Sequence, residues 1–180
     1  IADDRFLMNL AILHYHLNRG GVSRVIENQL AALDSVLGGE ERIRVAIFTG
    51  GRTDGWPYDL ADSFAQLDLS LHVVPGLDYD DRPQAQPDQL AAKLQNALAE
   101  IGFLPADTLL HIHNHSLGKN ASWPGAIRQL AAQGYAQLLQ IHDFAEDFRP
   151  RNYRLLAEAL GEEQLQALQF PQAAHIHYAV

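Results

Sequence analysis

The fold is decided by residues 6–37, which read FLMNLAILHYHLNRGGVSRVIENQLAALDSVL. The apolar run from Phe6 to His14 predicts a buried strand. Two glycines, Gly20 and Gly21, follow it and precede a helical pattern that ends before Gly38. The stretch therefore predicts a strand, a glycine turn and a helix. The apolar residues at helical spacing are Val22, Val25, Ile26, Leu30, Leu33 and Leu37.

The rest of the chain repeats this alternation. We expect further strands at residues 43–48, 69–74, 108–113, 136–142 and 173–180, and helices at 88–101, 123–133 and 153–160. Parallel neighbouring strands need crossover connections, and helices between strands supply them. The sequence therefore predicts an α/β fold, with a Rossmann-like, doubly wound and mainly parallel sheet and helices on both faces. We expect residues 1–180 to form a single domain of this kind.

Composition limits the possible functions. The chain has 180 residues, of which 47% are hydrophobic and 19% charged, as in an average globular domain. Its net charge of −9 offers no basic stripe, so we expect no nucleic-acid partner. The absence of cysteine excludes disulfides, thiolate zinc sites and a cysteine nucleophile. The apolar runs are far shorter than the roughly 20 residues of a membrane span, so we expect no transmembrane segment.

The two ends of the chain suggest a larger protein. The sequence begins at Ile1 without an initiator methionine and stops at Val180 inside a strand pattern. We therefore expect a piece of a longer chain. The lack of cysteine fits a cytoplasmic location, and we also consider one peripheral to the inner face of a membrane.

Histidines gather where the predicted strands end. Because the carboxyl ends of parallel strands meet at one edge, these side chains should converge on a single site there. The residues concerned are His14 and His16 after the first strand, His111, His113 and His115 around the fourth, His142 with Asp143 after the fifth, and His175 and His177 in the sixth.

The glycine pair has two interpretations. Gly20 and Gly21 could let the backbone approach a phosphate, which the free N–H groups and the dipole of the following helix favour. They could equally make only a tight turn between strand and helix. The sequence leaves both open.

The segment His111-Ile112-His113-Asn114-His115 is the second candidate element. In an extended segment its three histidines share one face, where imidazoles could bind zinc or act as acid, base or hydrogen-bond donor. We expect His111 to lie in the core and His113 and His115 to be functional. A metal-dependent hydrolase that uses these histidines and Asp143 is one hypothesis, although no complete ligand signature is present.

The third element runs from His142 to Tyr153. Its carboxylates, arginines and aromatic rings suit a sugar, whose hydroxyls need donors and acceptors and whose apolar faces pack on rings. The part from Glu146 to Arg151 could instead be a solvated loop with local ion pairs, worth ~0–1 kcal/mol each.

Taken in this order, the three elements resemble the N-terminal domain of family 4 glycosyltransferases. The resemblance rests on Gly20-Gly21-Val22-Ser23-Arg24, on His111 to Asn114 and on His142-Asp143, and it covers most of the chain. It implies the two-domain GT-B fold, with an N-terminal domain for the acceptor and a C-terminal domain for the nucleotide sugar. It also implies a hexosyltransferase type of reaction in which the anomeric configuration is retained.

The resemblance also implies roles for individual residues. Gly20, Gly21 and Arg24 would face the donor diphosphate, and His113 would lie at the reacting centre. His115, Lys119 and the acidic segment after Asp143 are not general features of the family. The acceptor side would comprise His16, Asn114, His115, Lys119, His142, Asp143, Asp147 and Arg149.

The implied partners are a nucleotide-sugar donor, a carbohydrate or glycan acceptor, and a missing C-terminal domain. That domain holds the family's donor-binding carboxylate motif, so these residues alone would be inactive. No metal or other cofactor would be required, because helix N-terminal amides and arginine can stabilise the leaving diphosphate. The alternative function is a free-standing sugar- or phosphate-binding module without catalysis.

Overall fold

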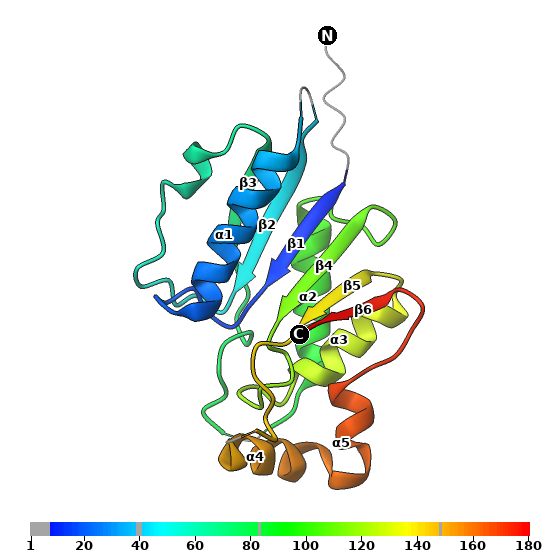
Figure 1. Ribbon diagram of the computed structural model, residues 1–180. Helices are drawn as coiled ribbons and strands as arrows, with labels where there is room; N and C mark the ends of the chain where they lie inside the picture. Colours follow the sequence, from blue (N-terminus) through cyan, green and yellow to red (C-terminus); the bar gives the residue numbers. More distant parts are fainter. Residues whose placement is uncertain (1–7, 39–40, 83, 148) are drawn as a thin grey trace.

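A computed structural model of the chain describes residues 8–38, 41–82, 84–147 and 149–180. Its six strands form one sheet in the order β3-β2-β1-β4-β5-β6, and every neighbouring pair is parallel (Figure 1). This is the strand order of the Rossmann fold, so the predicted fold class is confirmed. In chain order the elements are β1 (Asn9–Leu13), α1 (Gly21–Val36), β2 (Ile43–Thr49), the 3-10 helix η1 (Leu60–Ser63), β3 (Leu67–Val73), α2 (Pro87–Glu100), β4 (Thr108–His113), α3 (Trp123–Ala132), β5 (Ala136–Gln140), α4 (Pro150–Leu160), α5 (Glu162–Gln169) and β6 (Ile176–Ala179).

Helices cover both faces of the sheet, as predicted. On one face, Ile26 and Leu30 of α1 pack in a cluster with Ile12 of β1. On the other, helices α2 and α3 pack against Leu13 of β1 and Ile112 of β4. Successive strand residues point to opposite faces, so the continuous apolar run of β1 contributes to both cores.

The last two helices lie apart from these layers. Figure 1 shows α4 and α5 beyond the ends toward which the strands point. Leu156 of α4 and Leu165 of α5 form a small core with Ala121 and Ala145. The two helices therefore build up the carboxyl edge of the sheet, where the predicted site lies.

Several predicted boundaries needed correction. Strand β5 ends at Gln140 instead of His142, because the His142 N–H bonds to a side chain at the end of β4. Helix α4 begins at Pro150, since proline is favoured in the first turn. Strand β6 begins at Ile176 and β3 at Leu67. The predicted start of the first strand at residue 6 lies outside the described residues.

Helix α5 was not predicted. Its sequence, EEQLQALQ, buries only Leu165 and Gln169, so it carries no apolar stripe that periodicity could reveal. Tertiary packing at the carboxyl edge accounts for its burial.

Gly50 fixes the chain just after β2. A Cβ atom at this position would lie 2.5 Å from the backbone N of Asp78, which follows β3. The two connections at the carboxyl edge are therefore in direct backbone contact, and only glycine fits without a shift.

We predict that Gly50→Ala lowers the free energy of unfolding by about 1–3 kcal/mol, the usual effect of overpacking. Gly38→Ala is the matched control, because a Cβ there meets nothing within 4 Å. Urea denaturation of both variants provides the measurement. Equal stabilities for the two would contradict the close contact at Gly50.

Candidate functional site

The carboxyl ends of β1, β4 and β5 bring five histidines together, as the sequence predicted. The ring centroids of His111 and His113 are 4.3 Å apart, and those of His113 and His142 are 5.3 Å apart. The ring centroid of His14 lies 6.2 Å from that of His113 and 5.6 Å from that of His16. We call these five residues the histidine cluster.

Exposure differs within the histidine cluster. His113 is 0% exposed, and His14 and His111 are also buried. His16 and His142 are half-buried and are the members that a ligand can reach. The cluster thus has an inner layer behind an outer one.

Hydrogen bonds connect the layers. Nδ1 of His113 lies 3.0 Å from Nε2 of His142, and Nε2 of His113 is buried without a partner among the described residues. Nε2 of His111 lies 2.8 Å from Oε1 of Gln140, which also accepts the amide of Gln29. The prediction that His111 is a satisfied core histidine is therefore confirmed.

All five imidazoles are neutral at pH 7. Burial lowers the pKa of His14 to about 3 and that of His113 to about 2. Burial also lowers the pKa values of His16, His111 and His142. Each ring can therefore offer one donor and one acceptor nitrogen, but no fixed positive charge.

Asn114 joins the ends of β4 and β5. Its φ angle is 58°, in the left-handed region that asparagine tolerates better than most residues. Its Oδ1 accepts the N–H groups of His142 (2.7 Å) and Asp143 (3.1 Å). Its carbonyl accepts the Tyr15 hydroxyl at 2.8 Å. These bonds hold the loop after β5 against the end of β4.

The placement of His115 differs from the expectation. Because β4 ends at His113 and Asn114 is left-handed, the extended segment stops before His115. His115 is 0% exposed, and its Nε2 lies 2.6 Å from the carbonyl of Gln169. The expectation that it shares a face with His111 and His113 is wrong, and its side chain does not reach the surface of the edge.

The other predicted acceptor residues lie mostly in one shallow depression of about 510 Å³, which is lined by His142, Asp143, Phe144, Asp147 and Arg149. The guanidinium of Arg149 pairs with Asp143 at 3.0 Å. Asp147 is exposed. The depression therefore combines carboxylates, an arginine and a neutral imidazole in reach of solvent.

The predicted donor residues lie in a second depression of about 720 Å³, which includes Gly20, Gly21 and Arg24. Arg24 pairs with Glu27 at 2.6 Å, whereas Arg19, which the sequence analysis left out, also lines this space. Helix α1 has no side-chain cap and no acidic residue in its first turn. A Cβ at Gly21 would meet nothing within 4 Å, and one at Gly20 only a carbonyl at 3.6 Å, so the turn itself does not require glycine.

Tyr79 is central to this edge and was missed by sequence reasoning. Its ring centroid is 5.1 Å from those of Tyr15 and His16. The Cζ of Arg52 lies 4.9 Å above the ring, and Nζ of Lys119 lies 5.2 Å from it. Tyr79 therefore connects the histidine cluster to Lys119. It belongs to an irregular loop, where no periodicity could have marked it.

Within the described residues, no group of three or more His, Asp or Glu side chains is arranged to hold a metal ion. His115 bonds to a backbone carbonyl, and Asp143 pairs with Arg149. The geometry therefore offers no ligand set for the metal-dependent hydrolase that the sequence left open.

Comparison with known proteins identifies a distant relative. The chain is 26% identical over 173 residues to the mannosylglucosyl-3-phosphoglycerate synthase of Petrotoga mobilis. The matched residues make up 95% of this chain and 32% of that protein. The chain thus spans about a third of the length of this relative. The similarity supports a glycosyltransferase-like domain. Protein-family models and solved structures gave no match.

Among the described residues, no helix is both long and apolar enough to cross a bilayer.

The buried histidines predict a pH dependence of stability. The folded pKa values of His14 and His113 lie below the unfolded value of about 6.5, so between these values the unfolded chain binds more protons. Stability is full above pH 6.5 and falls as the pH drops toward 3. Each histidine should contribute a loss of about 2 kcal/mol between pH 6.5 and pH 5.

Urea denaturation at pH 7, 6 and 5 measures this loss. His14→Gln should make the pH dependence shallower, whereas His177→Gln, at an exposed position of β6, should leave it unchanged. An unchanged slope in His14→Gln would contradict a neutral, buried His14.

Proposed function

We propose that this chain is the N-terminal, acceptor-side domain of a retaining, nucleotide-sugar-dependent glycosyltransferase of the GT-B type. Similarity to a glycosyltransferase over 95% of the chain carries the proposal, and the Rossmann-like fold agrees with it. In this proposal the chain supplies the acceptor site and a loop that faces the donor diphosphate, while a further domain grips the nucleotide. Residues 1–180 alone are then inactive, and the enzyme works in the cytoplasm.

Two depressions suit the two substrates. One is lined by Gly20, Gly21 and Arg24 on the segment that follows β1, and the other includes His142, which follows β5. A sugar held between them would touch both outer histidines. This position at the carboxyl edge of the sheet is where open α/β folds bind their ligands.

The donor end is supported by the open start of α1. Uncapped N–H groups and the helix dipole favour a diphosphate, and Arg19 adds positive charge nearby, whereas Arg24 pairs with Glu27 of the same lining. Because neither glycine is needed by the fold, close approach of a ligand is the better explanation of Gly20 and Gly21. These groups can stabilise the charge of the leaving diphosphate, so the proposed reaction requires no metal.

The acceptor end is supported by the depression around Asp143. Its carboxylates can accept hydrogen bonds from sugar hydroxyls, and Arg149 can donate them. The relative's name describes a product with mannosyl and glucosyl groups on 3-phosphoglycerate. We take from it transfer of a hexosyl group to a carbohydrate acceptor.

At the reacting centre, we assign contact with the sugar to His142 and a role behind it to His113. The two rings stack at an interplanar angle of 7° and share a hydrogen bond. If His142 donates to His113, its own Nδ1 is left as an acceptor for a hydroxyl. Asn114 holds the His142 backbone in place.

We predict that Gly21→Ala separates binding from folding. Stability should stay within about 0.5 kcal/mol of the wild type or rise, because alanine favours helices. The KM of the full-length protein for its nucleotide sugar should rise about tenfold or more, because the methyl group stands where the diphosphate approaches. Gly38→Ala should change neither. An unaltered KM in Gly21→Ala would leave the glycine pair as a turn only.

We predict that His113→Ala and His142→Ala each lower sugar transfer at least ~100-fold in the full-length protein. The assay follows radiolabelled sugar from UDP- and GDP-linked hexoses into carbohydrate acceptors. His177→Ala serves as the control for loss of an exposed histidine. Wild-type rates in His113→Ala would disprove its role, and nucleotide-sugar binding without any transfer would favour the non-catalytic binding module.

A further inference from the structure

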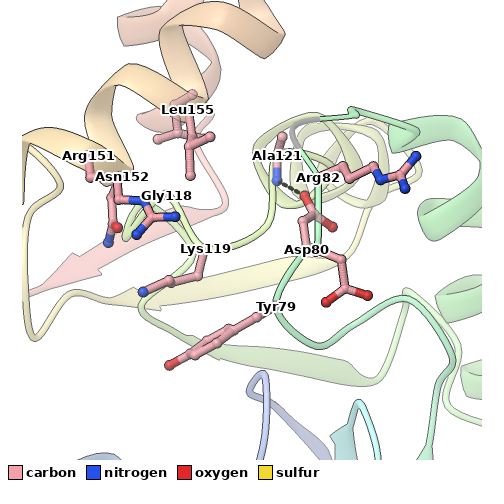
Figure 2. Close-up of a pocket in the computed structure, with 11 residues that line it drawn as sticks. Tyr79, Asp80, Arg82, Gly118, Lys119, Ala121, Arg151, Asn152 and Leu155 are labelled. Carbon is pink, nitrogen blue, oxygen red and sulfur yellow. Dashed lines mark hydrogen bonds between the residues drawn. The ribbon is translucent and has the colours of Figure 1, made fainter.

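A third cavity, of about 390 Å³, opens at the same edge between α4 and the loops that follow β3 and β4. Its lining includes Tyr79 and Lys119 from the loops and Arg151 from the first turn of α4, as Figure 2 shows. Asp80 and Arg82 also line it. Of its lining residues only Lys119 was expected on the acceptor side, and neither of the two depressions described above includes this space.

The cations of this cavity have no carboxylate partner among the described residues. Lys119 lies over the ring of Tyr79 instead of against an acid, and Arg151 is exposed on α4. A cation placed over an aromatic ring keeps its full charge, because the ring carries none. Both side chains therefore remain free to bind an anion.

The start of α4 strengthens this positive field. Arg149 is at the N-cap and Arg151 in the first turn, where no acidic residue is present. The positive end of a helix dipole favours anions and disfavours cations. Arg149 is paired with Asp143, so it is Arg151 whose charge lies unpaired near the helix dipole, and a bound anion would relieve that repulsion.

Two acids line the cavity, Asp80 and the exposed Asp81, and the first of them already has a structural role. Asp80 accepts the backbone N–H of Ala121 at 2.7 Å, and Figure 2 shows its carboxylate on the Arg82 side, away from the ends of Lys119 and Arg151. The hydroxyl of Tyr79 points to the same side as Lys119. Burial raises the pKa of Tyr79, so its hydroxyl stays a donor at neutral pH.

The two cations are held in a fixed relation. A Cβ on Gly118, which has φ 77°, would lie 2.7 Å from the carbonyl oxygen of Asn152, so the Lys119 loop touches the backbone of α4. The side-chain amide of Asn152 also donates to the carbonyl of Leu117 at 2.9 Å. The backbone segments that carry Lys119 and Arg151 are therefore held next to each other.

We propose that this cavity binds the anionic group of the acceptor, a phosphate or a carboxylate, through Lys119, Arg151 and the hydroxyl of Tyr79. That the bound anion belongs to the acceptor rests on the proposed function, whereas the anion site itself rests on the cavity alone. Tyr79 contacts His16, so an acceptor anchored here can extend to the histidine cluster. The substrate class is therefore an anionic carbohydrate.

Calorimetric titration of the full-length protein with glucose 6-phosphate, glucuronate and glucose tests the site. At least one of the two anionic probes should bind more tightly than glucose. Tighter binding of glucose 6-phosphate would indicate a phosphate site, and tighter binding of glucuronate a carboxylate site. Lys119→Gln and Arg151→Gln should each raise its Kd about tenfold, as expected for loss of a charge-assisted hydrogen bond. Arg154→Gln, on the same helix but outside the lining, should leave the Kd within about twofold. Equal binding of the three probes, or equal effects of Arg151→Gln and Arg154→Gln, would overturn the proposal.

Transfer assays separate this inference from the proposed function. Sugar transfer is measured with anionic and with neutral acceptors. Lys119→Gln and Arg151→Gln should lower transfer to the anionic acceptors and leave transfer to the neutral ones unchanged. Transfer that prefers neutral acceptors in the wild type would refute the anionic acceptor while the glycosyltransferase stands. If no acceptor receives sugar, but an anion binds tightly and both variants weaken its binding, the glycosyltransferase proposal is refuted. The anion site is then still supported.

Discussion

The side-chain amide of Asn114 is the interaction on which the carboxyl edge depends. It accepts two backbone N–H groups from the loop after β5 while its own backbone turns left-handed at the end of β4. A left-handed residue costs of order 1–2 kcal/mol, which the two hydrogen bonds can offset. The turn buries His115 beneath the edge, and the amide places His142 against His113. The single residue Asn114 thus determines that His115 is buried and that His142 remains accessible.

The edge uses two different ways of controlling charge. In the histidine cluster, burial removes charge, which leaves neutral rings suited to orienting hydroxyls. Around Tyr79, Lys119 lies over the aromatic ring and Arg151 lies in the first turn of α4, and both keep their charge. The two regions meet where Tyr79 contacts His16. A ligand crossing this boundary would pass from uncharged imidazoles to positively charged side chains.

The sequence was sufficient for the framework and for much of the site. Alternating strands and helices predicted the parallel sheet, and the sheet's geometry then brought His14, His113 and His142 together. It was insufficient where the chain leaves regular structure. The position of Tyr79 depends on loop packing, and α5 has no periodic apolar face. His115 was misplaced because one left-handed angle interrupts the alternation of a strand.

The position of β1 in the middle of the sheet affects how the chain can assemble during synthesis. β1 pairs with β2 soon after both leave the ribosome, but its other edge waits for β4, whose pairing residues begin at Thr108. Until then an apolar strand presents unpaired N–H and C=O groups, the kind of edge that joins other chains. The nascent chain is therefore most exposed to aggregation while the residues between β2 and β4 are being translated.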